Sequence, residues 1–249
     1  MKAGRRSFLK NAGLGALGLA ASKAFPTNAE GAAAGGGPRW AMLIDTRKCL
    51  QEKGCAKCAE ACHLAHNVPT LPNPRHAVKW IWKENFREAF PDQEAEYFDE
   101  VLTSSKMLVF CNHCDKPPCT RVCPTQATWR RGDGVVMMDW HRCIGCRYCV
   151  AACPYGSRSF NWVDPRPHLA NITPTYPTRT RGVVEKCTFC EERLPEHRPP
   201  ACVEACEARA MMFGDLADPT SEIREVLRTR FAVRRRPGLG THPEIFYLV

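Results

Sequence analysis

The sequence predicts an α+β fold built from four copies of one short unit: a strand, a cysteine-rich loop, a short helix and a second strand. Two observations indicate it. All sixteen cysteines fall into four groups of four, and short apolar or aromatic runs flank these groups. With 249 residues and 44% hydrophobic content, the chain can bury a core, as one domain or as two small ones.

The third cysteine group has the most specific spacing. It reads Cys143-Ile-Gly-Cys146-Arg-Tyr-Cys149-Val-Ala-Ala-Cys153-Pro154, or C-x2-C-x2-C-x3-C-P, which is the ligand run of bacterial ferredoxins. The first three thiolates can surround three corners of a [4Fe–4S] cluster, and the fourth points to a neighbouring cluster. Pro154 then ends the helical turn, because proline has no backbone N–H to donate.

The other three groups keep the final C-x3-C and lengthen one loop. The second group is enlarged by 116–118, the fourth has a longer insertion at the same place, and the first is stretched between its first two members. In chain order, these groups are Cys49, Cys55, Cys58 and Cys62; Cys111, Cys114, Cys119 and Cys123; and Cys187, Cys190, Cys202 and Cys206.

Zinc and disulfide bonds are the alternatives to iron–sulfur clusters. Zinc sites use paired C-x2-C turns and gain nothing from three cysteines in one run. Disulfides are chemically allowed in an oxidising compartment but do not explain an intact ferredoxin spacing. No C-x-x-C-H occurs, so covalent haem is not expected.

Strand-like runs flank the groups along the chain. The runs expected to lead into the four groups are 40–44, 107–110, 135–140 and 182–185, and those that follow three of them are 127–129, 159–162 and 210–213. We expect their side chains to form the core and to shield the clusters from water. After the last group, Asp218 to Glu222 looks like a helix start, with the helix running to about Arg230.

In two-cluster ferredoxins, each cluster takes three cysteines from one group and the last cysteine of the partner group. The adjacent second and third groups are therefore expected to form one module, and the first and fourth groups to close around it as the other. A [3Fe–4S] centre in one set is compatible with a full complement of cysteines. The expected ligand sets are Cys49, Cys55, Cys58 and Cys206 (set 1); Cys187, Cys190, Cys202 and Cys62 (set 2); Cys111, Cys114, Cys119 and Cys153 (set 3); and Cys143, Cys146, Cys149 and Cys123 (set 4).

The N-terminus looks like an export signal. Arg5-Arg6-Ser7-Phe8-Leu9-Lys10 precedes a short, weakly apolar run, the layout of the twin-arginine signal that carries folded proteins out of the cytoplasm. No later segment has the length and apolarity of a membrane span. We expect a periplasmic protein, peripheral to the membrane.

These assignments divide the chain into six parts. They are a signal and linker (1–34), an outer two-cluster module (40–62 with 182–215), an insertion (63–106), an inner two-cluster module (107–163), an irregular connector (164–181) and a C-terminal helix with a partner-docking tail (216–249). The insertion is rich in aromatics and includes a short acidic stretch near 92–100 that we expect to be helical. The terminal run 245–249 is apolar and ought to pack against something.

The net charge of +9 does not indicate nucleic-acid binding. Five basic residues lie in the expected signal, and thiolate-bound clusters add negative charge. Four histidines lie near the cysteines: His63, His66, His113 and His141. Since sixteen thiolates already satisfy four clusters, we expect hydrogen bonding or surface placement for them rather than ligation.

The chain resembles the four-cluster ferredoxin-like subunits of membrane oxidoreductases over most of 40–213. The features that carry this resemblance are the four cysteine groups and the twin-arginine signal. Within that family it is most similar to the DsrO type of DsrMKJOP complexes. The stretches that carry this finer likeness are 61–69 (Ala-Cys-His-Leu-Ala-His-Asn-Val-Pro), 80–84 (Trp-Ile-Trp-Lys-Glu), 177–187 (Pro-Thr-Arg-Thr-Arg-Gly-Val-Val-Glu-Lys-Cys) and the tail 234–249.

The resemblance implies a non-catalytic subunit that passes electrons through four [4Fe–4S] clusters. Its partners would be an integral membrane subunit of the NrfD or DsrP type, which interacts with quinone, and a multihaem cytochrome c, in dissimilatory sulfur metabolism. The alternative is the electron-transfer subunit of a molybdopterin enzyme such as polysulfide or tetrathionate reductase, or of a formate-dependent nitrite reductase system. No catalytic triad, flavin fingerprint or phosphate loop points to an enzyme.

Overall fold

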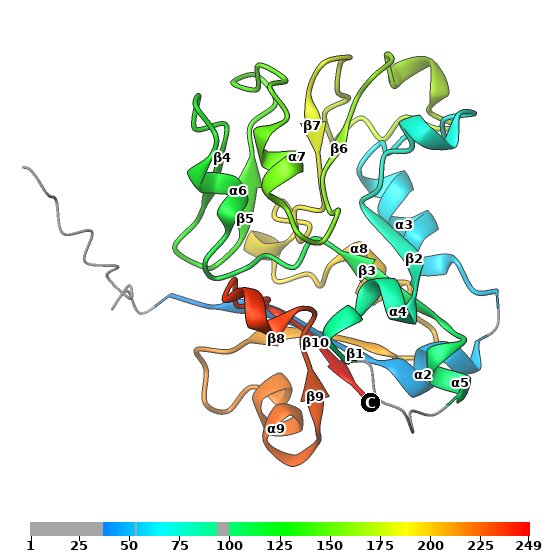
Figure 1. The fold of residues 1–249 in the computed structure, drawn as a ribbon, viewed down its shortest axis with the longest axis vertical. Coiled ribbons are helices and arrows are strands. Elements are labelled where there is room, and N and C mark those ends of the chain that lie inside the picture. Colours follow the sequence, from blue (N-terminus) through cyan, green and yellow to red (C-terminus); the bar gives the residue numbers. More distant parts are fainter. Residues whose placement is uncertain (1–36, 53, 94–99) are drawn as a thin grey trace, which may run out of the picture. The chain divides into compact units, whose positions relative to one another are not determined.

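A computed structural model describes residues 37–52, 54–93 and 100–249. The expected signal at 1–34 lies outside the described residues. Residues 37–249 form one unit of mixed α and β structure. Figure 1 shows it as short strands and helices joined by long loops, with no large continuous sheet.

The largest sheet has four strands, in the order β8 (Met211–Asp215), β1 (Trp40–Asp45), β10 (Ile245–Leu248) and β9 (Ala232–Val233). Strand β1 pairs antiparallel with β8 and parallel with β10. Side chains alternate between the two faces of a strand, so β1 packs Ala41 and Leu43 with Ile223 of helix α9 (Glu222–Thr229), and Met42 and Ile44 into the main core. The expected C-terminal helix is α9.

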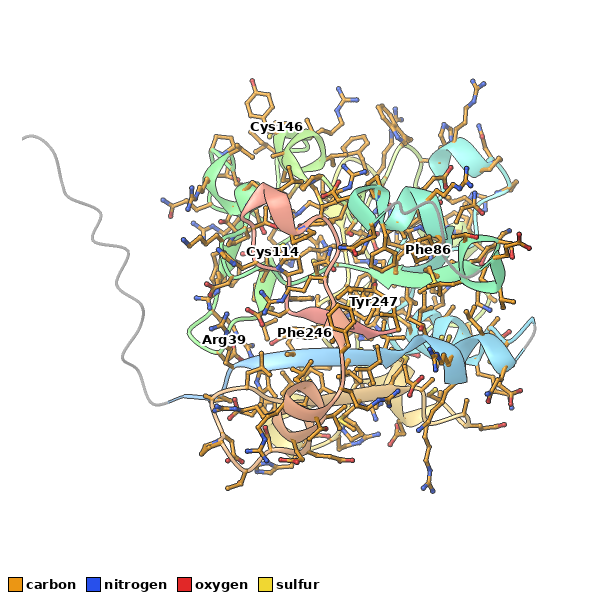
Figure 2. The ribbon with its side chains drawn as sticks, turned by 60° about the horizontal axis from the view of Figure 1, so that its bottom comes forward. Arg39, Phe86, Cys114, Cys146, Phe246 and Tyr247 are labelled. Atoms are coloured by element: carbon orange, nitrogen blue, oxygen red, sulfur yellow. The ribbon has the colours of Figure 1, made fainter. Side chains whose placement is uncertain are left out.

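The apolar C-terminus packs inside this sheet. Strand β10 lies between β1 and β9, and its Ile245 and Tyr247 are fully buried. The Tyr247 hydroxyl also donates to the carbonyl oxygen of Leu108 at 3.0 Å. Residues 245–248 are thus used within the chain itself (Figures 1 and 2), and docking of a partner by the wider segment 216–249 stays a prediction.

Three two-stranded ribbons make up the remaining β structure of the described residues. They pair β2 (Ile81–Asn85) with β3 (Lys106–Phe110), β4 (Thr128–Arg130) with β5 (Val136–Met138), and β6 (Ser159–Phe160) with β7 (Val184–Glu185). Each strand-like run named from the sequence overlaps one of the observed strands. Strand β2 was not expected, because it lies within the insertion.

Short helices carry many of the cysteines. They are α2 (Thr46–Gln51), α3 (Lys57–Ala65), α6 (Pro118–Arg121), α7 (Tyr148–Ala152) and α8 (Ala201–Glu204). Helix α3 packs against α8, and α6 packs against α7. Thus each of the two expected modules has its own pair of helices (Figure 1).

The insertion and the connector contain little further regular structure. The insertion has α4 (Phe86–Ala89), α5 (Glu100–Thr103) and the 3-10 turns Pro74–His76 and Pro91–Gln93; residues 94–99 of the expected acidic helical stretch lie outside the described residues. Its Trp80, Phe86 and Phe90 are buried in the main core. The connector holds only the 3-10 turn Arg166–His168, while Leu194–Glu196 and Pro237–Leu239 form similar turns further along. Among the described residues, no helix combines the length and apolarity that crossing a membrane requires.

Candidate iron–sulfur centres

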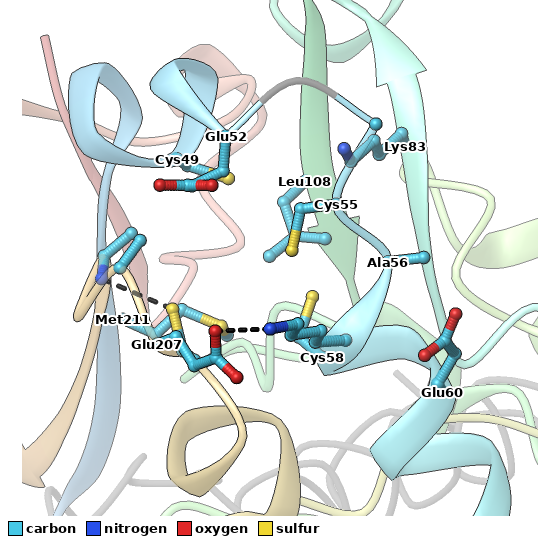
Figure 3. A pocket seen from close by; sticks show the side chains of 15 residues that line it. Cys49, Glu52, Cys55, Ala56, Cys58, Glu60, Lys83, Leu108, Glu207 and Met211 are labelled. Carbon is cyan, nitrogen blue, oxygen red and sulfur yellow. Dashed lines mark hydrogen bonds and ion pairs between the residues drawn. The ribbon is translucent and has the colours of Figure 1, made fainter.

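Set 1 surrounds an open cavity of about 500 Å³. Cys49 comes from α2, Cys58 from α3 and Cys206 from the turn after α8, with Cys55 in the loop between the first two. Figure 3 shows Cys49, Cys55 and Cys58 around one space. Burial raises the pKa of the Cys58 thiol to about 11, and the neighbouring thiols of Cys49, Cys206 and Cys55 add to the rise.

Set 2 lies deeper. Burial raises the pKa of Cys62 well above its usual value, and the thiols of Cys187, Cys202 and Cys190 raise it further. Backbone N–H groups point at two of the sulfurs: Ala201 N–H donates to Cys190 Sγ at 3.3 Å, and Phe189 N–H to Cys187 Sγ at 3.4 Å. Such hydrogen bonds stabilise thiolate over thiol.

Set 3 lines a second, smaller cavity. Cys111 follows β3, Cys119 lies in α6 and Cys153 follows α7. Burial raises the pKa of Cys114 strongly, and the thiols of Cys111, Cys119 and Cys153 act in the same direction.

Set 4 lies at the edge of the molecule, where Figure 2 labels Cys146. Cys149 is buried in a small apolar cluster against which Cys123 and Cys143 pack. The loop between Cys143 and Cys149 contains Gly145, whose φ is +70° and where a Cβ would collide with the carbonyl oxygen of Gly182. Only glycine fits that position, which explains the glycine inside this cysteine run.

Each of four short helical segments supplies two sets. Cysteines four residues apart lie about one helical turn apart, so the final C-x3-C of a group is spaced to supply one thiol to each of two neighbouring expected sets. Cys58 and Cys62 both lie in α3, whereas in the other three pairs the second cysteine lies just after the helix: Cys119 (α6) and Cys123, Cys149 (α7) and Cys153, and Cys202 (α8) and Cys206.

The electrostatic surroundings of the sixteen cysteines are suited to iron–sulfur clusters. None of the sixteen cysteines forms a disulfide. Buried thiols that raise one another's pKa ionise only beside positive charge, which an iron core supplies. Two buried cations that the sequence analysis did not single out, Arg158 and Lys186, also lie among these sulfurs, with Arg158 Nη2 donating to Cys119 Sγ at 3.0 Å. The sequence feature that could have drawn attention to Lys186 is its position directly before Cys187.

The histidines near the cysteines have other contacts. His66 is buried, with Nδ1 2.8 Å from the Cys62 carbonyl oxygen and Nε2 3.0 Å from Glu192. His113 accepts from the Val136 N–H at 3.0 Å and stacks on Phe189. His141 is exposed and His63 is partly buried. His66, Glu192 and Cys190 lie close enough to hold a metal ion, but Cys190 belongs to set 2.

Four groups of closely placed thiols, without disulfides and beside buried cations, define an iron–sulfur protein with four [4Fe–4S] clusters. The comparison with protein families agrees, since residues 105–166 and 173–216 match the model of the 4Fe-4S dicluster domain.

Several characterised proteins are similar over most of the chain. The Hdr-like menaquinol oxidoreductase iron-sulfur subunit 1 of Archaeoglobus fulgidus is 43% identical, over 84% of this chain and 82% of its own. A subunit of the tetrathionate reductase of Salmonella typhimurium is 35% identical over 100% of this chain and 89% of its own. Protein NrfC of Escherichia coli is 32% identical over 97% and 93%.

The chain therefore belongs to the family of ferredoxin-like iron–sulfur subunits of membrane oxidoreductases. Its role in that family is electron transfer.

Proposed function

We propose that this chain carries electrons along a row of four clusters, held by sets 1 to 4, between an NrfD- or DsrP-type membrane subunit and a multihaem cytochrome c. The complex would be of the DsrMKJOP type, in dissimilatory sulfur metabolism. When bound, each cluster accepts and releases single electrons. The chain's own residues hold the clusters, order them and exclude water.

The order of the sets is the observation that carries this proposal. The thiol of Cys62 in set 2 interacts with that of Cys58 in set 1. Cys187 of set 2 interacts with Cys111 of set 3, and Cys149 of set 4 interacts with Cys119 of set 3. These neighbours support a single row, from set 1 through sets 2 and 3 to set 4.

The two ends of the row differ in a way that suits two kinds of partner. Beside set 4, Ile144 is 67% and Tyr148 is 62% exposed. Exposed apolar side chains at such a place favour lasting contact with an apolar partner such as a membrane subunit. Set 1 opens instead onto a cavity lined by exposed charges of both signs, Glu52, Glu60, Glu207, Lys57 and Lys83, and a charged surface of this kind suits brief encounters with a soluble cytochrome.

The proposal includes export by the twin-arginine route and a place on the outer face of the cytoplasmic membrane. Replacing Arg5-Arg6 with two lysines is expected to leave unprocessed precursor in the cytoplasm. Normal export of that variant would contradict this part. The proposal also keeps the division into an outer module (sets 1 and 2), an inner module (sets 3 and 4), an insertion, a connector and a C-terminal segment.

The experiment that tests the proposed function is anaerobic capture of the protein from gently solubilised native membranes. Co-purification of a quinone-interacting membrane subunit and a multihaem cytochrome c is expected. Recovery of the protein alone, with its clusters intact, would contradict the membrane complex.

Docking at the set 4 end can be tested in the same preparation. Ile144→Asp places a charge in the proposed apolar contact, so the membrane subunit should be lost from the captured complex. Phe231→Asp is the matched control, because Phe231 is 74% exposed but lies on the connection between α9 and β9. Equal loss in both variants would contradict docking beside set 4.

A second candidate function is supported by the likeness to the tetrathionate reductase subunit over 100% of this chain. In that case the chain would be the electron-transfer subunit of a molybdopterin enzyme. Capture of a large molybdenum-containing subunit, in place of the cytochrome, would decide for it.

A further inference from the structure

Two cations are buried among the cysteine sets. Arg158 is 4% and Lys186 is 0% exposed. Arg158 Nη2 donates to Cys119 Sγ at 3.0 Å and to Thr128 Oγ1 at 2.8 Å. Lys186 Nζ donates to the carbonyl oxygens of Val136 and Cys187. The hydrogen-bond partners of both cations are therefore neutral oxygens and, for Arg158, the sulfur atoms of Cys119 and Met138.

Neither cation forms an ion pair with a carboxylate of the described residues. Arg179 provides the contrast, since it is as deeply buried and pairs with the buried carboxylate of Glu185 at 2.7 Å. A buried cation without a counter-ion is strongly unfavourable. A negative charge must therefore lie near Arg158 and Lys186 in the functional protein.

The nearby groups that can supply this charge are cysteines. Arg158 interacts with Cys119, Cys149, Cys111 and Cys153, in decreasing order. Lys186 interacts with Cys111, Cys187 and Cys119. Set 3 is the set that both cations share, and the other thiols named here belong to sets 2 and 4.

We propose that Arg158 and Lys186 raise the reduction potential of the cluster on set 3 above that of the cluster on set 1. A cluster gains negative charge on reduction, and a cation held close in a buried, low-dielectric site stabilises that charge. The charges that line the set 1 cavity, Glu52, Glu60, Glu207, Lys57 and Lys83, are all exposed, and Glu207 pairs with Lys57, so solvent screens them and no buried cation lies among them. This inference rests on the ligand sets of the proposed function.

An EPR-monitored redox titration of the purified complex tests the proposal. The signal lost in Cys114→Ser marks set 3, and the signal lost in Cys55→Ser marks set 1. In the wild type, the set 3 signal should appear at the higher potential. Lys186→Met and Arg158→Gln should each shift the set 3 signal to lower potential and leave the set 1 signal in place.

Two controls separate charge from packing. Arg166→Gln removes an exposed cation that pairs with Asp164 and should shift neither signal. Arg158→Lys keeps the buried charge and should keep the set 3 potential close to that of the wild type. A shift as large as that of Arg158→Gln would assign the effect to packing and overturn the proposal.

The order of the two reduction potentials in the wild type tests the proposal even if a variant loses iron. A set 1 signal that appears at the higher potential would overturn the proposal, as would a set 3 signal that stays in place in both charge-removing variants with full iron content. A failure of the ligand sets would show separately, because Cys114→Ser and Cys55→Ser would then remove no signal.

Discussion

Sets 1 and 3 have the same kind of ligands in different surroundings. All four thiols of set 1 are partly exposed, around an open cavity with three carboxylates in its lining. Three of the four thiols of set 3 are buried, and two buried cations lie beside them. Cysteine spacing therefore selects the cofactor, while the surrounding residues set its exposure and the charge around it. Those properties govern reduction potential and access to partners.

The largest expected effect is a difference in stability between variants that lose a buried cysteine of set 3 and a partly exposed cysteine of set 1. Cys114→Ser should abolish the cluster on set 3 and lower the unfolding temperature of the whole protein, because a cluster bound to buried ligands also contributes to folding stability. Cys55→Ser lies in the exposed loop of set 1 and should abolish that cluster with a smaller loss of stability. Iron content and thermal unfolding measure both effects, and equal destabilisation by the two variants would contradict the comparison.

A smaller effect is expected from the glycine in the set 4 loop. Gly145→Ala forces a Cβ against the carbonyl oxygen of Gly182 at a positive φ, so it should cost more than the ~1–2 kcal/mol of the backbone conformation alone. Gly156→Ala is the control, because its φ is +63° but no atom lies within 4 Å of the added Cβ. Chemical denaturation of the cluster-loaded protein should place Gly145→Ala clearly below Gly156→Ala in stability; the reverse order would exclude a tight contact at Gly145.

The smallest expected effect concerns helix α2, which carries Cys49 of set 1. Asp45 caps this helix by accepting the N–H of Lys48 at 3.1 Å, so Asp45→Ala should cost about 1 kcal/mol. Asp45→Asn should cost less, since asparagine also caps helices. Denaturation monitored by the set 1 signal measures the difference, and an equal loss in both variants would show that the cap is not the cause.

The pH dependence of this cap has a defined sign. Burial alone would raise the pKa of Asp45, but the hydrogen bonds from Lys48 and Arg230 outweigh it, and the pKa is lowered. The cap therefore contributes its full stability above the ordinary carboxylate pKa and loses it as the pH falls through the lowered value. Asp45→Asn should remove this part of the acid sensitivity.

Much of the fold followed from local patterns. The cysteine groups and the strands beside them could be predicted, because ligand spacing and short apolar runs are local properties of the chain. Helix α9 could be predicted as well, from the polar start at 218–222.

Long-range features could not be predicted in the same way. The position of β10 between β1 and β9 depends on pairing Ile245 with Met42, which no local pattern encodes. Strand β2 was missed because the burial of its residues depends on pairing with β3. The burial of Arg158 and Lys186 was missed because basic residues are usually exposed, and only the packed structure places them beside sulfur.

In the proposed row of clusters, set 3 lies between set 4 and the outer module, so electrons that enter at set 4 must pass through set 3. The most direct measurement is rapid-freeze EPR of the captured complex during reduction by quinol, in the wild type and in Cys114→Ser. In the variant, we expect the cluster on set 4 to be reduced still, and those on sets 1 and 2 to be reduced no longer. Reduction of sets 1 and 2 at the wild-type rate would contradict the row.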